Sequence, residues 1–344
     1  MRIGIIGINH KSASLPLRER LSHEATHLFG PFHIPYAHFS SILLSTCNRT
    51  EIYFHSEDLA ATHIYLLNVI REHVHEEFEH CVYSYFGKDC FLHLAKVTAG
   101  FDSALVGETE IQGQVKRAYE NTHSMHALPH ELHFLFQKCL KIGKEIRTQI
   151  GCFHPLPSIE HLVVQVGQRV VHDLSQTRIL FVGLSEINLK ILKYLKQVGA
   201  SSLSLCNRSE SRALSFAQQE GLSWLPWNRL HLWPSYDFVI FGTRSPKTIA
   251  YREDIVPESP CKLVVDLGLP RNVDPKVATS LTLFNIDQLH RTAGRKSLEK
   301  AAEWAHLETH VIVHAVKKQV FLFHSKNRHD REESHSLFFS CKFT

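Results

Sequence analysis

Short apolar runs separated by polar turns predict β-strands in the first part of the chain. Strands are predicted at Arg2–Ile8, Ser41–Leu44 and Ile52–His55. The segment Ser45–Glu51 is polar and is predicted to be the turn between the second and third of these strands.

Longer stretches of the same region have the period of an amphipathic helix. Leu17, Leu21, Ala25 and Leu28 recur at helical spacing until Gly30-Pro31 ends the pattern, which predicts a helix over 17–29. Further helices are predicted over 59–80 and over most of Cys90–Ile150, where Leu94, Val97, Phe101 and Leu105 define one face. Residues 1–150 are therefore expected to form an N-terminal α+β domain.

A different pattern follows the turn-forming segment Gly151–Ser158, which is interpreted as a linker. Helices predicted at Ile159–Leu174 and Ile187–Val198 alternate with short apolar strands, and this order is typical of a doubly wound parallel sheet, here over 151–290. The strands are predicted at Arg178–Val182, Ser202–Cys206, Phe238–Phe241, Leu263–Leu267 and Leu281–Phe284. The region 291–344 is predicted to hold a helix over Ser297–Phe323, roughly 40 Å long, and a polar tail from Ser325. The expected fold class is thus α/β and multidomain.

Composition narrows the class of protein. The chain has 344 residues, 44% of them hydrophobic and 21% charged, with a formal net charge of +4, as in ordinary globular proteins. It contains neither a run of about 18 apolar residues nor a signal-peptide pattern, so the expected location is the cytoplasm without membrane insertion. The eight cysteines lack a CxxC pair, which favours reduced thiols over disulfides or a zinc site.

A glycine turn follows the predicted strand at 178–182 and precedes a predicted helix. In a Rossmann domain this is where backbone N–H groups bind the pyrophosphate of a dinucleotide. Ser185 and Asn188 occupy the second and third glycine positions of GxGxxG, so the motif alone also fits a turn that binds nothing. The candidate cofactor-binding residues here are Gly183, Leu184, Ser185, Glu186, Ile187 and Asn188.

The end of the next predicted strand indicates which cofactor would bind. An NAD-specific domain places a carboxylate at this point, whereas this chain has Asn207, Arg208 and Ser209. Arg208 can pair with a 2′-phosphate, and its neighbours can donate hydrogen bonds, so NADPH is favoured over NADH. The alternative is that Arg208 is an exposed charge without a ligand.

Cys47 lies in the predicted turn between two apolar strands, next but one to Arg49. A nearby positive charge favours the thiolate, which attacks carbonyl carbon. Taken by residue type alone, a cysteine is more often an inert core residue.

The motif Ser45-Thr-Cys-Asn-Arg-Thr-Glu51 resembles that of the glutamyl-tRNA reductase family. Matching blocks follow in collinear order over roughly residues 1–320. They are Gly7–Ser12, Gly107–Lys116, Leu135–Lys138, the turn at Gly183, Cys206–Ser209, Asp266–Arg271 and Asn285–Leu289.

The resemblance implies an NADPH-dependent enzyme that reduces glutamyl-tRNA(Glu) to glutamate-1-semialdehyde, the first step of tetrapyrrole synthesis. It makes Cys47 the nucleophile that holds glutamate as a thioester and His93 a second catalytic residue. It also assigns Arg49 to the substrate carboxylate and implies hand-over of the aldehyde to glutamate-1-semialdehyde aminomutase. The implied substrate-binding residues are Thr46, Asn48, Arg49, Ser103, Glu108, Thr109, Glu110 and Gln114.

The chain departs from the family pattern in three places. Thr109, Glu110 and Gln112 replace Pro, Gln and Leu of a GEPQILGQVK-like block. A carboxylate at position 110 is unfavourable beside an anionic substrate unless it is paired. The glycine turn is GLSEIN where the family has a GAGEMG-like sequence, and only about twenty residues follow the last predicted helix, which argues against a homodimer.

Other functions compete with this one. His23–His33 fits HExxHxxGxxH, the zinc motif of metzincin proteases, but His23 and His27 would point away from the apolar face of the helix, as surface histidines do, so no metal is expected. A degenerate homologue could instead bind charged tRNA or a pathway enzyme without turnover. A shikimate-dehydrogenase-like enzyme is a third alternative, in which the cysteine turn would have no function.

Overall fold

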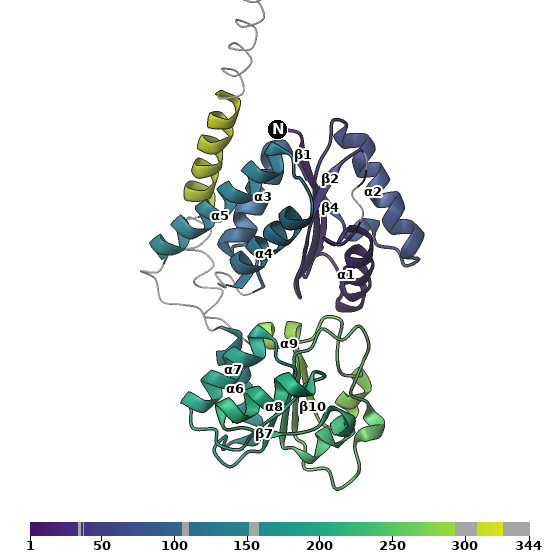
Figure 1. Ribbon diagram of the computed structural model, residues 1–344, viewed down its shortest axis with the longest axis vertical. Helices are drawn as coiled ribbons and strands as arrows, with labels where there is room; N and C mark the ends of the chain where they lie inside the picture. Colours follow the sequence, from purple (N-terminus) through teal and green to yellow (C-terminus); the bar gives the residue numbers. More distant parts are fainter. Residues whose placement is uncertain (34–35, 37, 105–109, 151–157, 293–307, 326–344) are drawn as a thin grey trace, which may run out of the picture.

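Two sheets, one antiparallel and one parallel, organise the chain. The computed structural model describes residues 1–33, 36, 38–104, 110–150, 158–292 and 308–325. The first sheet and its helices form the upper part of Figure 1, here called the antiparallel-sheet domain, and the second forms the lower part, the parallel-sheet domain. The elements of the first are β1 (Ile3–Asn9), α1 (Leu15–Phe29), β2 (Ser40–Ser45), β3 (Arg49–His55), α2 (Leu59–His73), η1 (Glu79–Cys81), β4 (Tyr83–Phe86), α3 (Gly87–Ala99), α4 (Glu110–Met125) and α5 (His130–Ile150).

Helices cover both faces of the antiparallel sheet. The strand order is β2-β3-β1-β4, and α1 and α2 lie on one face while α3, α4 and α5 lie on the other (Figure 1). Because side chains alternate along a strand, Ile52 and Phe54 pack towards α1 and α2, whereas Tyr53 packs towards α3 and α5. The central strands are therefore buried on both sides.

The turn before β3 is shorter than the sequence predicted. Arg49, Thr50 and Glu51 belong to β3 and pair with Asn9, Ile8 and Gly7 of β1, so the prediction of a polar turn over Ser45–Glu51 was wrong at its second half. Polar residues are tolerated in this buried strand because Arg49 and Glu51 bond to each other.

Several predicted helices end earlier or begin elsewhere. The helix predicted over 59–80 ends at His73, where Arg71 donates to the carbonyls of Val74 and Glu76. The helical stretch predicted from Cys90 begins at Gly87 and breaks at Gly100, which has a φ of 84° and leaves Phe101 outside the helix. Leu105 lies outside the described residues.

Three more features of this half differ from the prediction. The strand β4 was not predicted, although it pairs with β1. The buried stripe of α1 runs through Leu15, Arg18, Leu21, Ala25 and Phe29, so Leu17 and Leu28 are only partly buried. The stripe therefore contains a charged residue, and Arg18 is 1% exposed.

The parallel sheet has the strand order of a Rossmann fold. The order is β10-β9-β8-β5-β6-β7, so the chain leaves β5 in one direction and later returns to β8 on its other side. Ligands of such sheets bind beyond the carboxyl ends of the two central strands. The elements are α6 (Ile159–Val171), β5 (Ile179–Val182), α7 (Glu186–Gln197), β6 (Leu203–Cys206), α8 (Glu210–Glu220), β7 (Ser223–Trp224), η2 (Trp227–Ser235), β8 (Phe238–Phe241), η3 (Arg252–Asp254), β9 (Leu263–Asp266), η4 (Pro275–Thr279), β10 (Thr282–Asn285) and α9 (Ile286–Thr292).

The two faces of this sheet are covered differently. The helices α6, α7 and α9 pack on one face together with Ala213 of α8. The other face packs against Leu230 and Trp233 of η2 and Val277 of η4, which are short 3₁₀ segments. The elements α8 and β7 were not predicted from the sequence. The α/β fold class with a parallel Rossmann sheet is confirmed.

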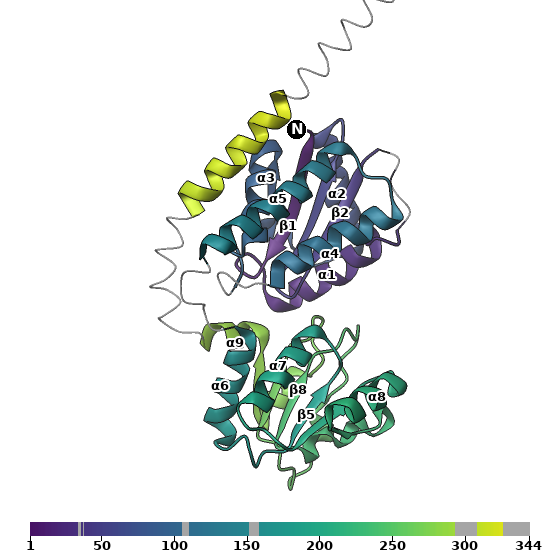
Figure 2. The same ribbon diagram turned by 60° about the vertical axis from the view of Figure 1, so that its left-hand side comes forward.

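A helix close to the end of the chain packs on the antiparallel-sheet domain. It comprises the π-helical turn η5 (Glu308–Ile312) and an α-helix over 313–325, and it lies beside α3 and α5 (Figure 2). Ile312 and Val316 belong to the same core as α3, and the Phe323 ring lies 4.9 Å from that of Phe134. The predicted start of this helix at Ser297 and most of the predicted tail lie outside the described residues. The linker 151–157 lies outside them too.

Within the described part of the chain, no helix combines the length and the apolar content needed to cross a bilayer.

Two helical glycines provide a test of the packing of α3 against α5. A Cβ atom on Gly143 of α5 would lie 2.9 Å from Thr98 Cγ2 and 3.0 Å from the Thr98 carbonyl oxygen, whereas one on Gly113 of α4 would meet only Arg117 Nη1, at 3.7 Å. We expect Gly143→Ala to lower the free energy of unfolding by about 1–3 kcal/mol, because the backbone of α3 must move. Gly113→Ala should raise it by up to about 1 kcal/mol through helix propensity. Urea unfolding measures both, and equal effects would contradict the close approach.

Candidate active site

The turn that carries Cys47 is held by its own hydrogen bonds. Thr46 Oγ1 accepts from the backbone N–H groups of Asn48 and Arg49, at 3.1 and 3.2 Å. The Asn48 carbonyl accepts from the backbone N–H of His10, at 2.8 Å, which ties the turn to the end of β1. Cys47 is half-buried at the apex. The sequence placed Thr46 and Asn48 at the substrate, and the structure gives Thr46 a role in shaping the turn.

A buried carboxylate lies directly behind this turn. Glu51 of β3 has no exposed surface, and its Oε1 atom accepts from Arg49 Nη1 at 2.8 Å and Tyr83 OH at 2.6 Å and lies 2.8 Å from His93 Nε2. Its Oε2 atom accepts from Tyr53 OH at 2.7 Å. Four side chains from β3, β4 and α3 therefore converge on one carboxylate.

The charges in this network hold each other in the ionised state. Burial alone would raise the pKa of the Glu51 carboxyl, but Arg49 and His93 outweigh burial and hold that pKa well below its usual range. Because an ionised carboxylate only accepts hydrogen bonds, His93 Nε2 carries the proton that it donates to Glu51, and Nδ1 is the ring nitrogen that is not bonded to Glu51. The ring of Tyr85 stacks on His93 with centroids 5.0 Å apart. The sequence-predicted His93 thus has a fixed orientation.

Arg49 is already paired within the protein. Its side chain is 1% exposed, Nη1 also donates to Asp102 Oδ2 at 3.0 Å, and Nη2 donates to the Asp102 carbonyl oxygen. Lys11 Nζ bonds to the other oxygen of Asp102, at 2.6 Å. A substrate carboxylate that binds Arg49, as the sequence suggested, would therefore compete with Asp102 for the guanidinium group.

The remaining substrate candidates differ in what the structure says of them. Ser103 is buried beside Asp102, and its hydroxyl has no hydrogen-bond partner among the described residues. Gln114 is partly buried on α4. Glu108 and Thr109 lie outside the described residues. Of the predicted residues, the structure therefore brings Arg49 and His93 together at Glu51, and it places Thr46, Cys47 and Asn48 in the turn directly before that strand.

Cys47 also lies at the boundary between the two domains. It packs against the apolar core of the parallel-sheet domain, as Leu184 of the glycine turn does. Its carbonyl oxygen accepts from Arg18 Nη1 of α1 at 2.8 Å. Arg18 Nη2 in turn donates to Asp287 Oδ2 of α9, at 2.5 Å. The cysteine turn and the parallel-sheet domain are thus joined through one guanidinium group.

The glycine turn has the backbone geometry that a dinucleotide site needs. Gly183 has a φ of 100°, and a Cβ atom there would lie 2.6 Å from the Gly242 carbonyl oxygen at the end of β8. Ser185 caps α7 by accepting from the Asn188 N–H, at 3.3 Å. Asn188 Nδ2 donates to the carbonyls of Val182 and Gly183, and a Cβ on Gly242 would lie 2.4 Å from Asn188 Oδ1. Asparagine fits at the third glycine position because Gly242 leaves room for it.

The candidate residues for the 2′-phosphate lie beside this turn. Val182 of β5 pairs with Cys206 of β6, so Asn207, Arg208 and Ser209 follow the strand next to Gly183. Arg208 is exposed, and Asn207 Nδ2 donates to the Ser209 carbonyl at 3.2 Å. Leu184 and Ile187 pack inward on the sheet, which leaves the backbone of the turn and Arg208 as the groups able to meet a dinucleotide.

Two ion pairs cross between the domains next to the glycine turn. Glu110, at the start of α4, pairs with Lys190 of α7, and Glu186, at the start of α7, pairs with Arg117 of α4 at 3.0 Å. The carboxylate at position 110, which departs from the family pattern, is therefore neutralised by the other domain. Glu110, which was predicted to bind substrate, thus contacts Lys190, and Glu186, which was predicted to bind the cofactor, contacts Arg117.

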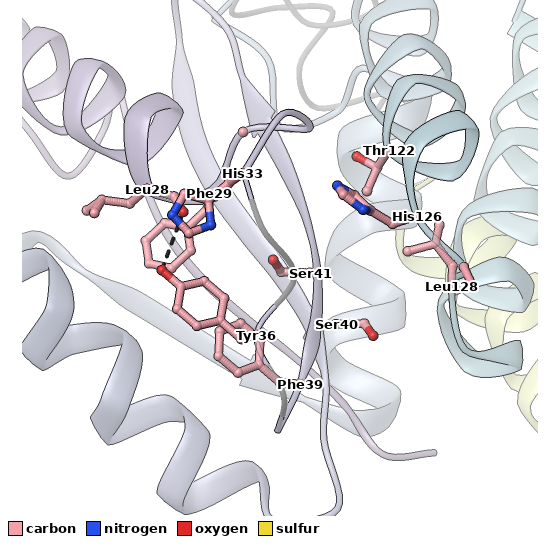
Figure 3. A pocket seen from close by; sticks show the side chains of 12 residues that line it. Leu28, Phe29, His33, Tyr36, Phe39, Ser40, Ser41, Thr122, His126 and Leu128 are labelled. Atoms are coloured by element: carbon pink, nitrogen blue, oxygen red, sulfur yellow. Dashed lines mark hydrogen bonds between the residues drawn. The ribbon is translucent and has the colours of Figure 1, made fainter.

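Two hollows that described residues line differ in size and position. The first, of about 40 Å³, lies between α1, β2 and the end of α4, where Tyr36 OH donates to the Leu28 carbonyl and His126 lies opposite (Figure 3). It is too small for a substrate and does not include Cys47. The second is a cleft of about 880 Å³ between the domains, lined by Glu19 and Arg271 among others, which is within the usual size of ligand sites.

The histidines of the zinc-like motif lie on the exposed side of α1. His23 and His27 are exposed, with ring centroids 6.3 Å apart, and His23 Nδ1 lies 3.0 Å from Glu24 Oε1. In the part of the chain that the structure describes, no three His, Cys, Asp or Glu side chains are grouped to hold a metal ion.

Sequence reasoning missed Glu51, Asp102 and the pair of Arg18 with Asp287. Glu51 was treated as part of a polar turn, although its place two residues before Tyr53 in a buried strand signals a buried charge that needs partners. Arg18 within the apolar stripe of α1 gave a similar signal. Asp102 and Asp287 gave none, because their partners are distant in sequence.

The fold and site define a two-domain oxidoreductase in which a cysteine turn meets a Rossmann-type nucleotide-binding domain. The family model "Glutamyl-tRNAGlu reductase, N-terminal domain" matches residues 6–150, and "Shikimate / quinate 5-dehydrogenase" matches residues 165–292. The chain is 33% identical over 340 residues to the glutamyl-tRNA reductase of Chlamydia pneumoniae, covering 96% of this chain and 95% of that relative. The chain belongs to the glutamyl-tRNA reductase family.

Other matches have the same name. The glutamyl-tRNA reductase of Carboxydothermus hydrogenoformans is 29% identical over 330 residues, covering 91% of this chain and 72% of the relative. The solved glutamyl-tRNA reductase of Methanopyrus kandleri is 23% identical, covers 97% of this chain and 82% of its own, and has a TM-score of 0.49.

Two partly buried histidines predict how stability depends on pH. Burial lowers the pKa of His10 and of His290 from 6.5 to about 4. The unfolded chain therefore binds these protons first as the pH falls, so the histidine contribution is complete above about pH 6.5 and is lost between about pH 6.5 and 4. Burial raises the pKa of Asp266 to about 7, which acts in the opposite direction.

The contribution of one histidine is isolated by comparing wild type with His290→Gln. Urea unfolding followed by circular dichroism should show that the wild type loses more stability than the variant between pH 7.5 and pH 5. Parallel pH profiles of the two proteins would contradict the lowered pKa of His290.

Proposed function

We propose that the protein reduces glutamyl-tRNA(Glu) to glutamate-1-semialdehyde with NADPH, through a thioester on Cys47. The observation that carries the proposal is the position of Cys47, at the apex of a fixed turn and against the core of the nucleotide-binding domain. Membership of the glutamyl-tRNA reductase family supports the substrate and the role in tetrapyrrole synthesis.

The first half-reaction is an acyl transfer to sulfur. The Cys47 thiolate attacks the glutamyl carbonyl carbon, a C–S bond forms, the ester C–O bond breaks, and the ribose oxygen of the tRNA leaves with a proton. The thioester carbonyl is more electrophilic than the ester, because sulfur donates poorly into it. The Nδ1 atom of His93 is the acceptor that holds or transfers a proton, since Nε2 is bonded to Glu51.

The parallel-sheet domain fits NADPH by its own geometry. Gly183 leaves the backbone of the turn open at the start of α7, where a pyrophosphate is stabilised, and Arg208 lies at the adjoining strand end as a partner for the 2′-phosphate. When bound, NADPH supplies the hydride that replaces sulfur on the substrate carbon. Cys47 must then face this domain, and its packing against the same core as Leu184 supports that orientation.

Two alternative functions predict different results in the experiments below. A degenerate homologue would bind charged tRNA without consuming it, and a shikimate-dehydrogenase-like enzyme would oxidise or reduce a small hydroxy acid without Cys47. The ordered network around Glu51 favours a reactive site over both. We further propose that the enzyme acts in the cytoplasm and passes its reactive aldehyde to glutamate-1-semialdehyde aminomutase.

The two half-reactions should separate by mutation, because they use different domains. Gly183→Val places a side chain where a Cβ already meets Gly242, so hydride transfer should fail while Cys47 still attacks the ester. We expect this variant to convert charged tRNA to free glutamate with no aldehyde. Adding Cys47→Ser should stop the release of glutamate, because a serine hydroxyl is a much weaker nucleophile than a cysteine thiolate.

Chromatography of labelled glutamate and aldehyde measures both outcomes. Circular dichroism must show that each variant is folded. A folded Gly183→Val protein that leaves charged tRNA intact would contradict the assignment of the two half-reactions to different domains. Aldehyde formation by Cys47→Ser at the wild-type rate would contradict the thioester.

Cofactor preference should depend on Arg208. Arg208→Ala should weaken NADPH binding about ten- to hundredfold and NADH binding little, because a charge-assisted hydrogen bond contributes about 1.5–3 kcal/mol. Arg212, an exposed residue in the first turn of α8, provides a matched control. Fluorescence titration measures the affinities, and equal weakening of the two cofactors would show that Arg208 does not meet the 2′-phosphate.

A further inference from the structure

Arg18 is a buried charge on a helix that otherwise buries apolar and small polar side chains. It lies in the apolar stripe of α1 and is 1% exposed, whereas Arg20 on the same helix has a side chain that is 53% exposed and pairs with Glu76. Burying a guanidinium group is unfavourable unless its hydrogen bonds are satisfied, and an apolar residue of similar size would often be at least as stable. The hydrogen-bond partners of Arg18 therefore indicate why a charged residue occupies this position.

The two terminal nitrogens of Arg18 bind groups in different domains. Nη1 donates to the carbonyl oxygen of Cys47 at 2.8 Å, and Nη2 donates to Asp287 Oδ2 at 2.5 Å. Asp287 lies in the first turn of α9, directly after β10 of the nucleotide-binding sheet. The planar guanidinium fixes the angle between these two bonds. The backbone of Cys47 is therefore held at a set place relative to that sheet.

The next residue of α1 makes a second connection of opposite charge. Glu19 Oε1 accepts from the backbone N–H and Nε of Arg271, at 2.6 and 2.8 Å. Arg271 follows β9 in a loop that Asp266 holds by accepting from the N–H groups of Gly268 and Asn272. Asn272 Oδ1 also accepts from Thr243, which follows Gly242. This connection thus reaches Gly242, which lies against Gly183 at the centre of the sheet.

We infer that Arg18 is a positioning residue for the reduction step, with Asp287 as its partner. The inference rests on the proposed function, because it assigns Arg18 to the orientation of the Cys47 thioester relative to the nucleotide-binding domain. Loss of the Arg18–Asp287 bond frees the cysteine turn from that domain. The thioester then still forms, but it meets water before it meets the hydride donor and is hydrolysed to glutamate with regeneration of the thiol.

The experiment compares Asp287→Asn, Arg18→Lys and Arg18→Ala with Arg20→Ala as the matched control. Asp287→Asn removes the charge of the partner but keeps Arg18 and its bond to Cys47. We expect the ratio of aldehyde to free glutamate to fall about ten- to hundredfold in Asp287→Asn and Arg18→Ala, because small misplacements of reacting groups have effects of this size. Total consumption of charged tRNA should stay within about twofold, and Arg18→Lys should restore part of the ratio.

A second readout needs neither substrate nor cofactor. The rate at which iodoacetamide alkylates Cys47, followed by peptide mass spectrometry, should rise in Asp287→Asn and Arg18→Ala and stay unchanged in Arg20→Ala. If Arg18→Ala does not fold, Asp287→Asn still tests the contact from the other domain.

The outcomes distinguish this inference from the proposed function. An unchanged ratio and alkylation rate in folded Asp287→Asn would overturn the inference, as would a parallel loss of aldehyde and of tRNA consumption, which indicates a purely structural role. A wild-type protein that releases neither aldehyde nor glutamate would instead overturn the proposed function, and the alkylation rates would still test the contact.

Discussion

The carboxylate of Glu51 is the constraint on which the antiparallel-sheet domain depends. It is fully buried, and it is stabilised only because Arg49, His93, Tyr53 and Tyr83 all direct donors at it. Removing the Tyr53 hydroxyl leaves Oε2 without a donor, and removing Arg49 takes a neutralising charge from a buried carboxylate, and each loss costs more than the bond itself contributes. The network therefore fixes β3 and β4 and the orientation of α3 in a single arrangement. The cysteine turn directly precedes β3, so the position of the turn depends on how β3 is packed.

The nucleotide-binding domain meets that turn through charges more than through apolar surface. Arg18 and Glu19 of α1 and Glu110 and Arg117 of α4 each pair with an opposite charge on the other domain. The pairs on α4 are exposed and contribute little each, whereas Arg18 is buried and its pairing is obligatory. Charge pairs of this kind set the register between two domains with little apolar burial. The position of Cys47 relative to the parallel sheet is therefore set by few bonds.

Local patterns predicted most of the framework, because apolar periodicity reports which face of an element is buried. The strands β5, β8 and β9 and the helix α1 were predicted within a few residues. Cys47, His93 and Arg208 were proposed as site residues from their motif positions. Residues whose role depends on a distant partner could not be predicted. Asp102 becomes part of the site only because the segment after α3 lies against Lys11 and Arg49, and Asp287 only because the two domains meet. The end of α2 was missed because its cap is made by Arg71, which otherwise continues the helical pattern.

The contact between Asn188 and Gly242 has a consequence for how dinucleotide turns are recognised. The small residue that keeps a helix close to the central strand need not belong to the turn itself, since here it stands at the end of β8, more than fifty residues later. Positions 188 and 242 consequently form one steric unit, and a larger residue at one requires a smaller residue at the other. Substitutions at the two positions should be correlated among related chains. A fingerprint that reads only consecutive residues scores this turn as degenerate, whereas one that compares adjoining strand ends finds the missing glycine.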